Sequence, residues 1–224
     1  MPVSIVNSCL IKGSTMGKRN EQRRQKALAR QKAKRKKAKA VNHSSSPTFS
    51  GSSILLTSQA PIYECKIPKS IFEMGIGHIV FSRRFPSGKI CVAVFLLDVF
   101  CLGVKDVFCH TVDPGEYTQI IERLAYNEPI ESIDPACARK LIEGAVQYAQ
   151  RLSLRPHLDY KVVEKIFGDV DAAACPLSFE YGRDGKPFYV AGPNDTPAKS
   201  RQVISVLEQQ CGPDGFHYMV GVEL

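Results

Sequence analysis

The densest group of reactive side chains lies between Asp98 and His110, where the sequence reads DVFCLGVKDVFCH. This segment holds two carboxylates, two thiols, a lysine and an imidazole. Asp98 follows a run of apolar residues, so it is expected at the end of a buried strand. Together with Asp106 it has the chemistry to share a divalent metal ion, as hydrolases and nucleases require. Glu143 and Asp171 are the further ligands that this hypothesis would use.

The same segment also suggests nucleophilic catalysis. Cys101 or Cys109 would act as the nucleophile and His110 as its base. Adjacent residues on a strand point to opposite faces, however, so Cys109 and His110 are poorly placed to meet.

A structural interpretation explains the same residues, and we favour it because structural ion pairs imitate active sites. In it, Asp98 caps a turn at Leu102-Gly103, while Lys105 and Asp106 are paired or solvated. The catalytic residues therefore stay unknown, and the candidates are Asp98, Asp106, Cys109 and His110.

Three other segments have features of ligand sites. The loop 182–186 (GRDGK) and the loop 192–196 (GPNDT) combine glycines with groups that are able to bind an anion. Arg155-Pro156-His157 follows a helix and presents an imidazole. A hairpin turn, a helix cap and a surface histidine account for these segments without any ligand, and we favour those interpretations.

The elements that would position these residues begin with strands. An alternating segment, 62–67, precedes two strands at 77–85 and 89–99, and Pro86-Ser87-Gly88 supplies the turn of a β-hairpin. The strand 89–99 is apolar on both faces, so it is expected at the centre of a sheet. A short strand is expected at 100–104.

Helices and further strands follow. Asp113, Asp134 and Asp159 each begin a predicted helix, the first with a capping box. Strands at 178–181 and 187–191 are predicted to form another hairpin. Thr196-Pro197 begins a helix that runs to Cys211, and a last strand follows it. This order predicts an α+β fold with a mixed, mostly antiparallel sheet and helices grouped on one face.

The net charge of +8 is divided unevenly along the chain. Residues 16–40 carry 12 Lys or Arg and one acid, whereas residues 41–224 carry 17 basic and 21 acidic residues. A segment of this charge density attracts phosphates and releases their counterions. RNA is favoured over DNA, because arginine-rich segments fold readily on RNA. The nucleic-acid-binding candidates are Lys18, Arg19, Arg23, Arg24, Lys26, Arg30, Lys32, Lys34, Arg35, Lys36, Lys37 and Lys39.

Other roles for the basic segment are a solvated tail, a nuclear address or contact with an acidic membrane. A membrane partner is not expected, since the segment has no Phe or Trp to insert. The leading interpretation is a non-catalytic RNA- or ribosome-associated protein, and the alternative is a metal-dependent hydrolase or nuclease. A third hypothesis is a protein-interaction adaptor whose basic tail is incidental.

Domain limits follow from composition. Residues 1–15 are expected to be disordered or an extension of the gene model, 16–43 form the basic tail, 44–60 a Ser-rich linker and 61–224 one domain. No segment is long and apolar enough for a membrane span, and no export signal is found. The eight cysteines lack C-x-x-C spacing. We therefore expect free thiols in a reducing cytoplasm, without a metal site or a cofactor.

Three segments carry a resemblance to a known family: FLLDVFCLGVKD, EGAVQYAQRLSLRPHLDY and FEYGRDGKPFYVAGPND. They are similar to a family of uncharacterised conserved bacterial proteins, over most of residues 75–220. The resemblance implies a bacterial, cytoplasmic protein and transfers no activity.

Overall fold

The computed structural model describes residues 57–193 and 195–220. All the described residues belong to one compact unit, Pro47–Leu224. No helix among these residues is long and apolar enough to cross a membrane.

The predicted basic tail (16–43), the segment before it and most of the predicted linker lie outside the described residues. The fold is therefore that of the predicted domain, 61–224, preceded by a few residues of the linker.

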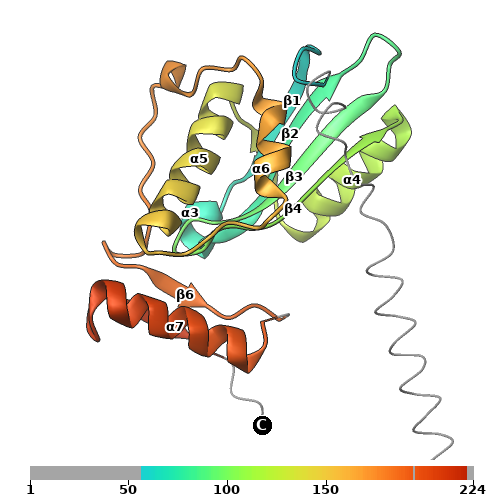
Figure 1. The fold of residues 1–224 in the computed structure, drawn as a ribbon. Helices are drawn as coiled ribbons and strands as arrows, with labels where there is room; N and C mark the ends of the chain where they lie inside the picture. The colour runs from blue at the N-terminus through green and yellow to red at the C-terminus, as the bar shows by residue number, and fades with distance from the viewer. Residues whose placement is uncertain (1–56, 194, 221–224) are drawn as a thin grey trace, which may run out of the picture. The chain divides into compact units, whose positions relative to one another are not determined.

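A five-stranded antiparallel sheet forms the centre of this domain, in the order β4-β3-β2-β1-β5 (Figure 1). Its strands are β1 (Ile62–Pro68), β2 (Ile76–Arg84), β3 (Ile90–Asp98), β4 (Gly103–Val112) and β5 (Ile130–Ser132). The predicted hairpin is confirmed, because β2 and β3 pair along their whole length. The predicted central position of β3 is also confirmed, since β4 pairs with its other edge.

The side chains of β3 alternate between two apolar cores, as the period of a strand requires. Ala93, Phe95 and Leu97 belong to one core, and Val92 and Val94 to the other. Because both faces are buried, β3 has no polar side chain before Asp98.

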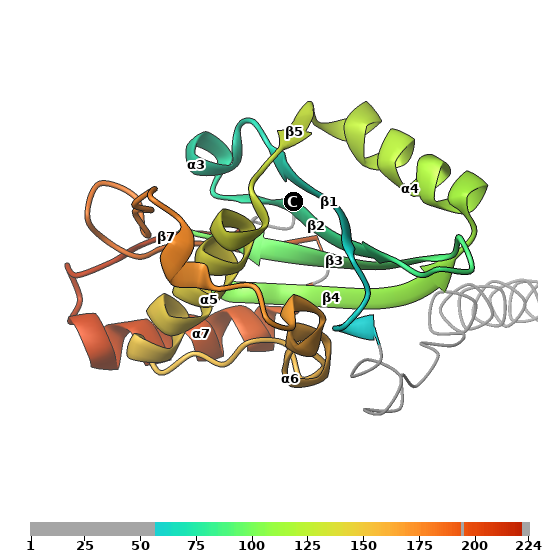
Figure 2. The ribbon, with the colours of Figure 1, turned by 90° about the horizontal axis from the view of Figure 1, so that it is seen from above.

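Helices cover both cores, and Figure 2 shows them around the strands. Helix α5 (Pro135–Arg151), helix α6 (Tyr160–Val163) and the 3-10 helix η1 (Glu164–Phe167) pack on the first core. Helix α4 (Pro114–Asn127) packs on the second. The α+β class is confirmed, and α4 is the exception to the predicted grouping of helices on one face.

Polar side chains that cap the first turn mark where helices α5 and α7 begin. Asp134 accepts a hydrogen bond from the backbone N–H of Ala136 at the start of α5. Thr196 accepts one from Lys199 at the start of helix α7 (Pro197–Cys211). The capping box predicted at Asp113 is wrong, because its side chain accepts no bond from the helix.

The predicted short strand at 100–104 is wrong. Residues 99–102 form a turn, and the next strand, β4, runs from Gly103 to Val112. Gly103 has φ 65°, a conformation that glycine adopts without strain. Buried and exposed side chains do not alternate regularly at the start of β4. The cause is a shift in its register with β3, which falls between Leu96 and Leu97.

The hairpin predicted at 178–191 is also wrong. Residues 183–186 do form a tight turn, but 178–181 is not a strand. Instead, β6 (Phe188–Val190) pairs in parallel with β7 (His217–Met219), and α7 connects the two. The backbone N–H of Phe188 donates to Phe100 in the turn after β3, which fixes β6 beside the main sheet.

The expectation of free thiols is wrong for Cys137 and Cys175, which form a disulfide. They are 38 residues apart in sequence, so no local spacing signals the pair. The bond ties the start of α5 to the segment after the 3-10 helix η2 (Ala172–Ala174). Both cysteines are buried, so a reductant reaches the bond only after local opening. Among the described residues, five other cysteines are free thiols.

Arg83 on β2 is a buried charge, with 2% of its surface exposed. Its guanidinium donates to three backbone carbonyls: those of Ile166 and Phe167 in η1, at 2.6 and 2.7 Å, and that of Ala60, at 2.6 Å. One side chain therefore joins the sheet, the helical layer and the segment that enters the domain.

Replacing Arg83 by Met leaves these three carbonyls without their donor. Each buried unsatisfied group costs about 1–3 kcal/mol, so Arg83→Met is expected to lower the free energy of unfolding by about 3 kcal/mol or more. Urea denaturation measures the change. Arg84→Met is the matched control, because the neighbouring Arg84 is exposed and its loss is expected to cost under about 1 kcal/mol. Equal losses in the two variants would contradict the role of Arg83.

Candidate functional site

Asp98, the first residue of the candidate set, builds the turn that follows β3. Its Oδ1 accepts the backbone N–H groups of Phe100 at 3.0 Å and Cys101 at 2.9 Å. The residue is 5% exposed, and burial raises its pKa to about 6, against the opposing effect of Lys105. These contacts agree with the turn-capping interpretation.

A polar network next to this turn attaches α7 to the sheet. The Lys105 ammonium lies 3.7 Å from Asp195, and Lys199 lies 2.8 Å from the other oxygen of the same carboxylate. Burial alone raises the pKa of Asp195, but the hydrogen bond from Lys199 and that from the Gly192 N–H bring the pKa below its usual value. Tyr189 also contacts Asp195 and Ser200.

The carboxylates of the metal hypothesis do not converge. Asp98 is buried, while the side chain of Asp106 is 71% exposed and lies 3.8 Å from His157. Glu143 pairs with Arg139, and Asp171 caps η2. Within the part of the chain that the structure describes, no group of three or more His, Cys, Asp or Glu side chains is arranged to hold a metal.

Cys109 and His110 point to opposite faces of β4, as expected from strand alternation. Cys109 is buried in the first core with its Sγ 3.4 Å from that of Cys91. The hydrogen bond with Cys91, together with burial, raises the pKa of the Cys109 thiol. His110 is half-buried beside Phe108. The predicted nucleophile and base are therefore not brought together.

In the loops with features of ligand sites, the polar groups make hydrogen bonds to other residues of the chain. In the loop 192–196, the Asp195 carboxylate accepts the Gly192 N–H, at the position where an anion would bind. In the loop 182–186, Lys186 donates to the carbonyl of Asp214. His157 lines a shallow cavity of about 550 Å³ formed by residues 150–161, a single local segment.

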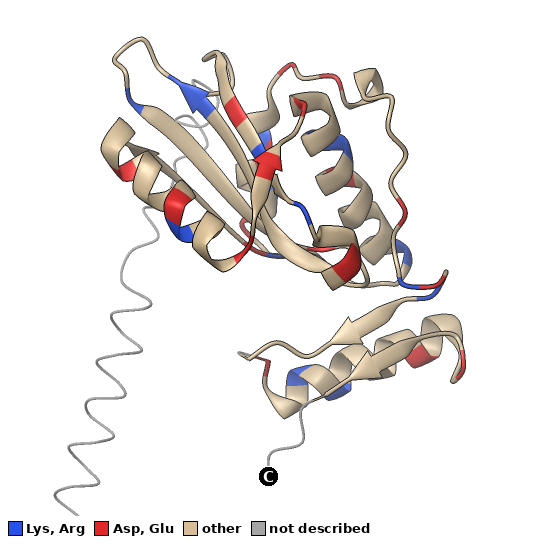
Figure 3. Ribbon diagram, turned by 180° about the vertical axis from the view of Figure 1, so that it is seen from behind, with Lys and Arg blue, Asp and Glu red and all other residues tan. Residues whose placement is uncertain are grey.

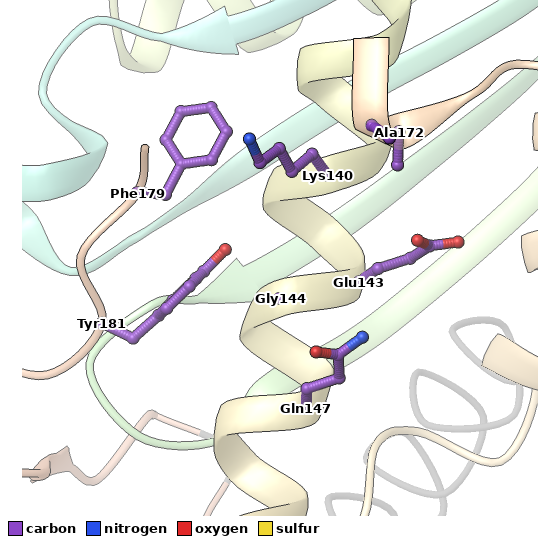
Figure 4. Close-up of a pocket in the computed structure, with 8 residues that line it drawn as sticks. Lys140, Glu143, Gly144, Gln147, Ala172, Phe179 and Tyr181 are labelled. Carbon is purple, nitrogen blue, oxygen red and sulfur yellow. The ribbon is translucent and has the colours of Figure 1, made fainter. Parts of the chain in front are cut away.

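A groove that sequence reasoning missed lies over the outer face of α5 (Figure 4). Its volume is about 340 Å³, and we call it the α5 groove. The side chains of Phe179 and Tyr181 form one wall, and helix α5 contributes the rest together with Ala172 and Ala173 of η2. The lining residues on α5 are Lys140, Glu143, Gly144 and Gln147.

Contacts across 30 to 40 residues of sequence build the α5 groove. The Lys140 ammonium donates to the carbonyls of Cys175 and Leu177, and Tyr181 donates to that of Leu141. Gly144 makes room for Tyr181, because a Cβ there would lie 2.1 Å from the tyrosine oxygen. A glycine in the middle of a helical sequence was the one local signal of this close approach.

A scan against protein-family models, a search of curated proteins and a search of solved structures each gave no match. The bacterial family resemblance therefore stays a prediction.

The raised pKa of Asp98 predicts a pH dependence of stability. The folded protein holds this proton up to about pH 6, whereas the unfolded chain releases it near the ordinary value of 3.8. The contribution of Asp98 is therefore complete below about pH 4 and declines as the pH rises to 6, by about 3 kcal/mol in total.

Asp98→Asn keeps an oxygen for the two N–H groups and removes the titration. The difference in unfolding free energy between the variant and the parent, measured by urea denaturation from about pH 4 to pH 7, is expected to shift in favour of the variant as the pH rises. A difference that does not change with pH would refute the assignment.

The contact between Gly144 and Tyr181 predicts a coupled pair. Gly144→Ala is expected to cost about 1–3 kcal/mol of unfolding free energy through overpacking. In a Tyr181→Ala background the same change is expected to be neutral or stabilising, because Ala is the better helix former. Thermal and urea unfolding of the four proteins measure the coupling. Gly115→Ala on α4, with nothing within 4 Å of the new Cβ, is the control.

Proposed function

We propose that the protein is a non-catalytic RNA-binding protein of the cytoplasm, held on RNA or the ribosome by the basic segment Lys18–Lys39. The observation that carries this proposal is the charge of residues 16–40, which hold 12 Lys or Arg and one acid. Such a density of positive charge binds phosphates by releasing counterions. A membrane surface is a poorer partner, because the segment has almost no apolar residues to insert.

The charge of the domain supports assigning this role to the segment alone. Residues 41–224 hold more acidic than basic residues, 21 against 17. Both Lys or Arg and Asp or Glu are spread over the described elements (Figure 3). The domain therefore has no surplus of positive charge with which to bind a phosphate backbone.

A metal-dependent hydrolase is not supported by the arrangement of its candidate ligands. Asp98 is buried, and its carboxylate accepts hydrogen bonds from backbone N–H groups. Asp106, in contrast, is exposed beside His157.

Binding to RNA should depend on the basic segment and on salt. The full chain is expected to co-sediment with ribosomes or total RNA and to lose at least ~1,000-fold in affinity between about 50 and 200 mM salt, as for six to ten phosphate contacts. A version starting at Val41 should not bind. A variant with the residues 18–39 in scrambled order is the matched control, because it keeps the charge and should keep the affinity. Equal binding by the full and shortened chains would refute the proposal.

A further inference from the structure

The α5 groove lies beside aromatic rings that stack in pairs. Phe72 and Phe179 are parallel, with their centroids 5.9 Å apart and the ring planes 9° from each other. Tyr148 and Tyr181 stack at 5.8 Å and 24°. Phe72 is 42% exposed, and the other three rings are half-buried. This surface therefore presents partly accessible aromatic rings instead of a closed core.

The ring wall of the α5 groove is held in place before any ligand arrives. Tyr181 is fixed by its hydrogen bond to the Leu141 carbonyl, at 3.1 Å. The chain leading to Phe179 is held by the Lys140 ammonium and by the disulfide of Cys175. A preformed wall loses little conformational entropy when a ligand binds.

The remaining lining gives the α5 groove a polar edge. Gln147 is exposed on α5, and its amide has both hydrogen-bond donors and acceptors. Lys140 and Glu143 have opposite charges, so they give the groove no net attraction for phosphate. Ring faces beside an amide suit a planar ligand that carries hydrogen-bonding groups on its edge, which is the chemistry of a nucleobase.

We propose that the α5 groove binds an unpaired base of RNA, stacked on the face of Phe179, with Tyr181 at its side and its edge toward Gln147 (Figure 4). This inference rests on the proposed RNA binding, and it assigns to the domain the base contact that the basic segment does not supply. The volume of about 340 Å³ is in the range of small-ligand sites. Because both parts belong to one chain, RNA held by the basic segment is at a high effective concentration for the groove.

The test measures the affinity of the full chain for a labelled single-stranded RNA by fluorescence anisotropy. Phe179→Leu is expected to weaken binding on the order of tenfold, because a stacked base loses its ring. Tyr181→Leu should also weaken binding, whereas Tyr181→Phe keeps the ring and loses only its hydrogen bond to Leu141, so it should weaken binding less. Tyr126→Leu is the matched control, since Tyr126 is 90% exposed on α4 and is not part of the groove.

A second probe separates bases from phosphates. A strand of the same length with abasic sites keeps its phosphates, so the parent protein should bind it about as weakly as Phe179→Leu binds intact RNA. Phe179→Leu itself should not distinguish the two strands. The salt dependence of all groove variants should match that of the parent, because phosphate contacts set it.

Gln147→Glu tests the groove without changing a ring, so it can be used if a ring variant fails to fold. Gln147 is exposed, and the new carboxylate removes the amide donors and repels the acceptors of a base. Weaker binding by this variant with an unchanged salt dependence supports the inference.

Two different results would overturn the inference, and they can be told apart. If the full chain binds RNA with the expected salt dependence while folded groove variants and the abasic strand behave like the parent and intact RNA, the groove assignment fails and the proposed function stands. If the full chain binds neither strand, both fail.

Discussion

The fold depends on a single buried guanidinium. Arg83 lies on β2, and its three hydrogen bonds reach the entry of the domain at Ala60 and the helical layer at Ile166 and Phe167. A guanidinium suits this position because its planar fork holds several donors in fixed directions. The ring of Phe167 then packs against two strands of the sheet, with centroids 5.2 Å from Phe81 and 5.6 Å from Phe95. The layer over the first core is thereby fixed to the strands at one place.

The α5 groove is a consequence of how the chain leaves this layer. After Gly168 it passes over α5, where the disulfide and Lys140 hold it, and it continues to β6 beside the turn after β3. The groove remains where this crossing segment and the helix do not fill the space between them. Taken together, the two proposals divide the properties needed to bind RNA between two parts of the chain: charge in the basic segment and a preformed surface of rings in the domain.

The reactive residues that stand out in the sequence contribute mainly to structure. Asp98 orders the turn after β3, and Lys105 joins α7 to the sheet through Asp195. Cys109 and His110 are adjacent in sequence but separated by the plane of the sheet. Residues 98–110 are rich in reactive side chains, but they do not form a site. The turn after β3 and the alternation of side chains along β4 place each of them in a different environment.

The sequence by itself determined the features that depend on near neighbours. These are the hairpin of β2 and β3, the starts of α5 and α7, the α+β class and the uneven distribution of charge. Only the tertiary structure decided the pairing of β6 with β7, the disulfide and the α5 groove. The reason is the distance along the chain: Arg83 bonds to a residue 83 positions away, and Tyr181 to one 40 positions away. Local propensity and spacing carry no information about such partners, which are set when the layers pack against each other.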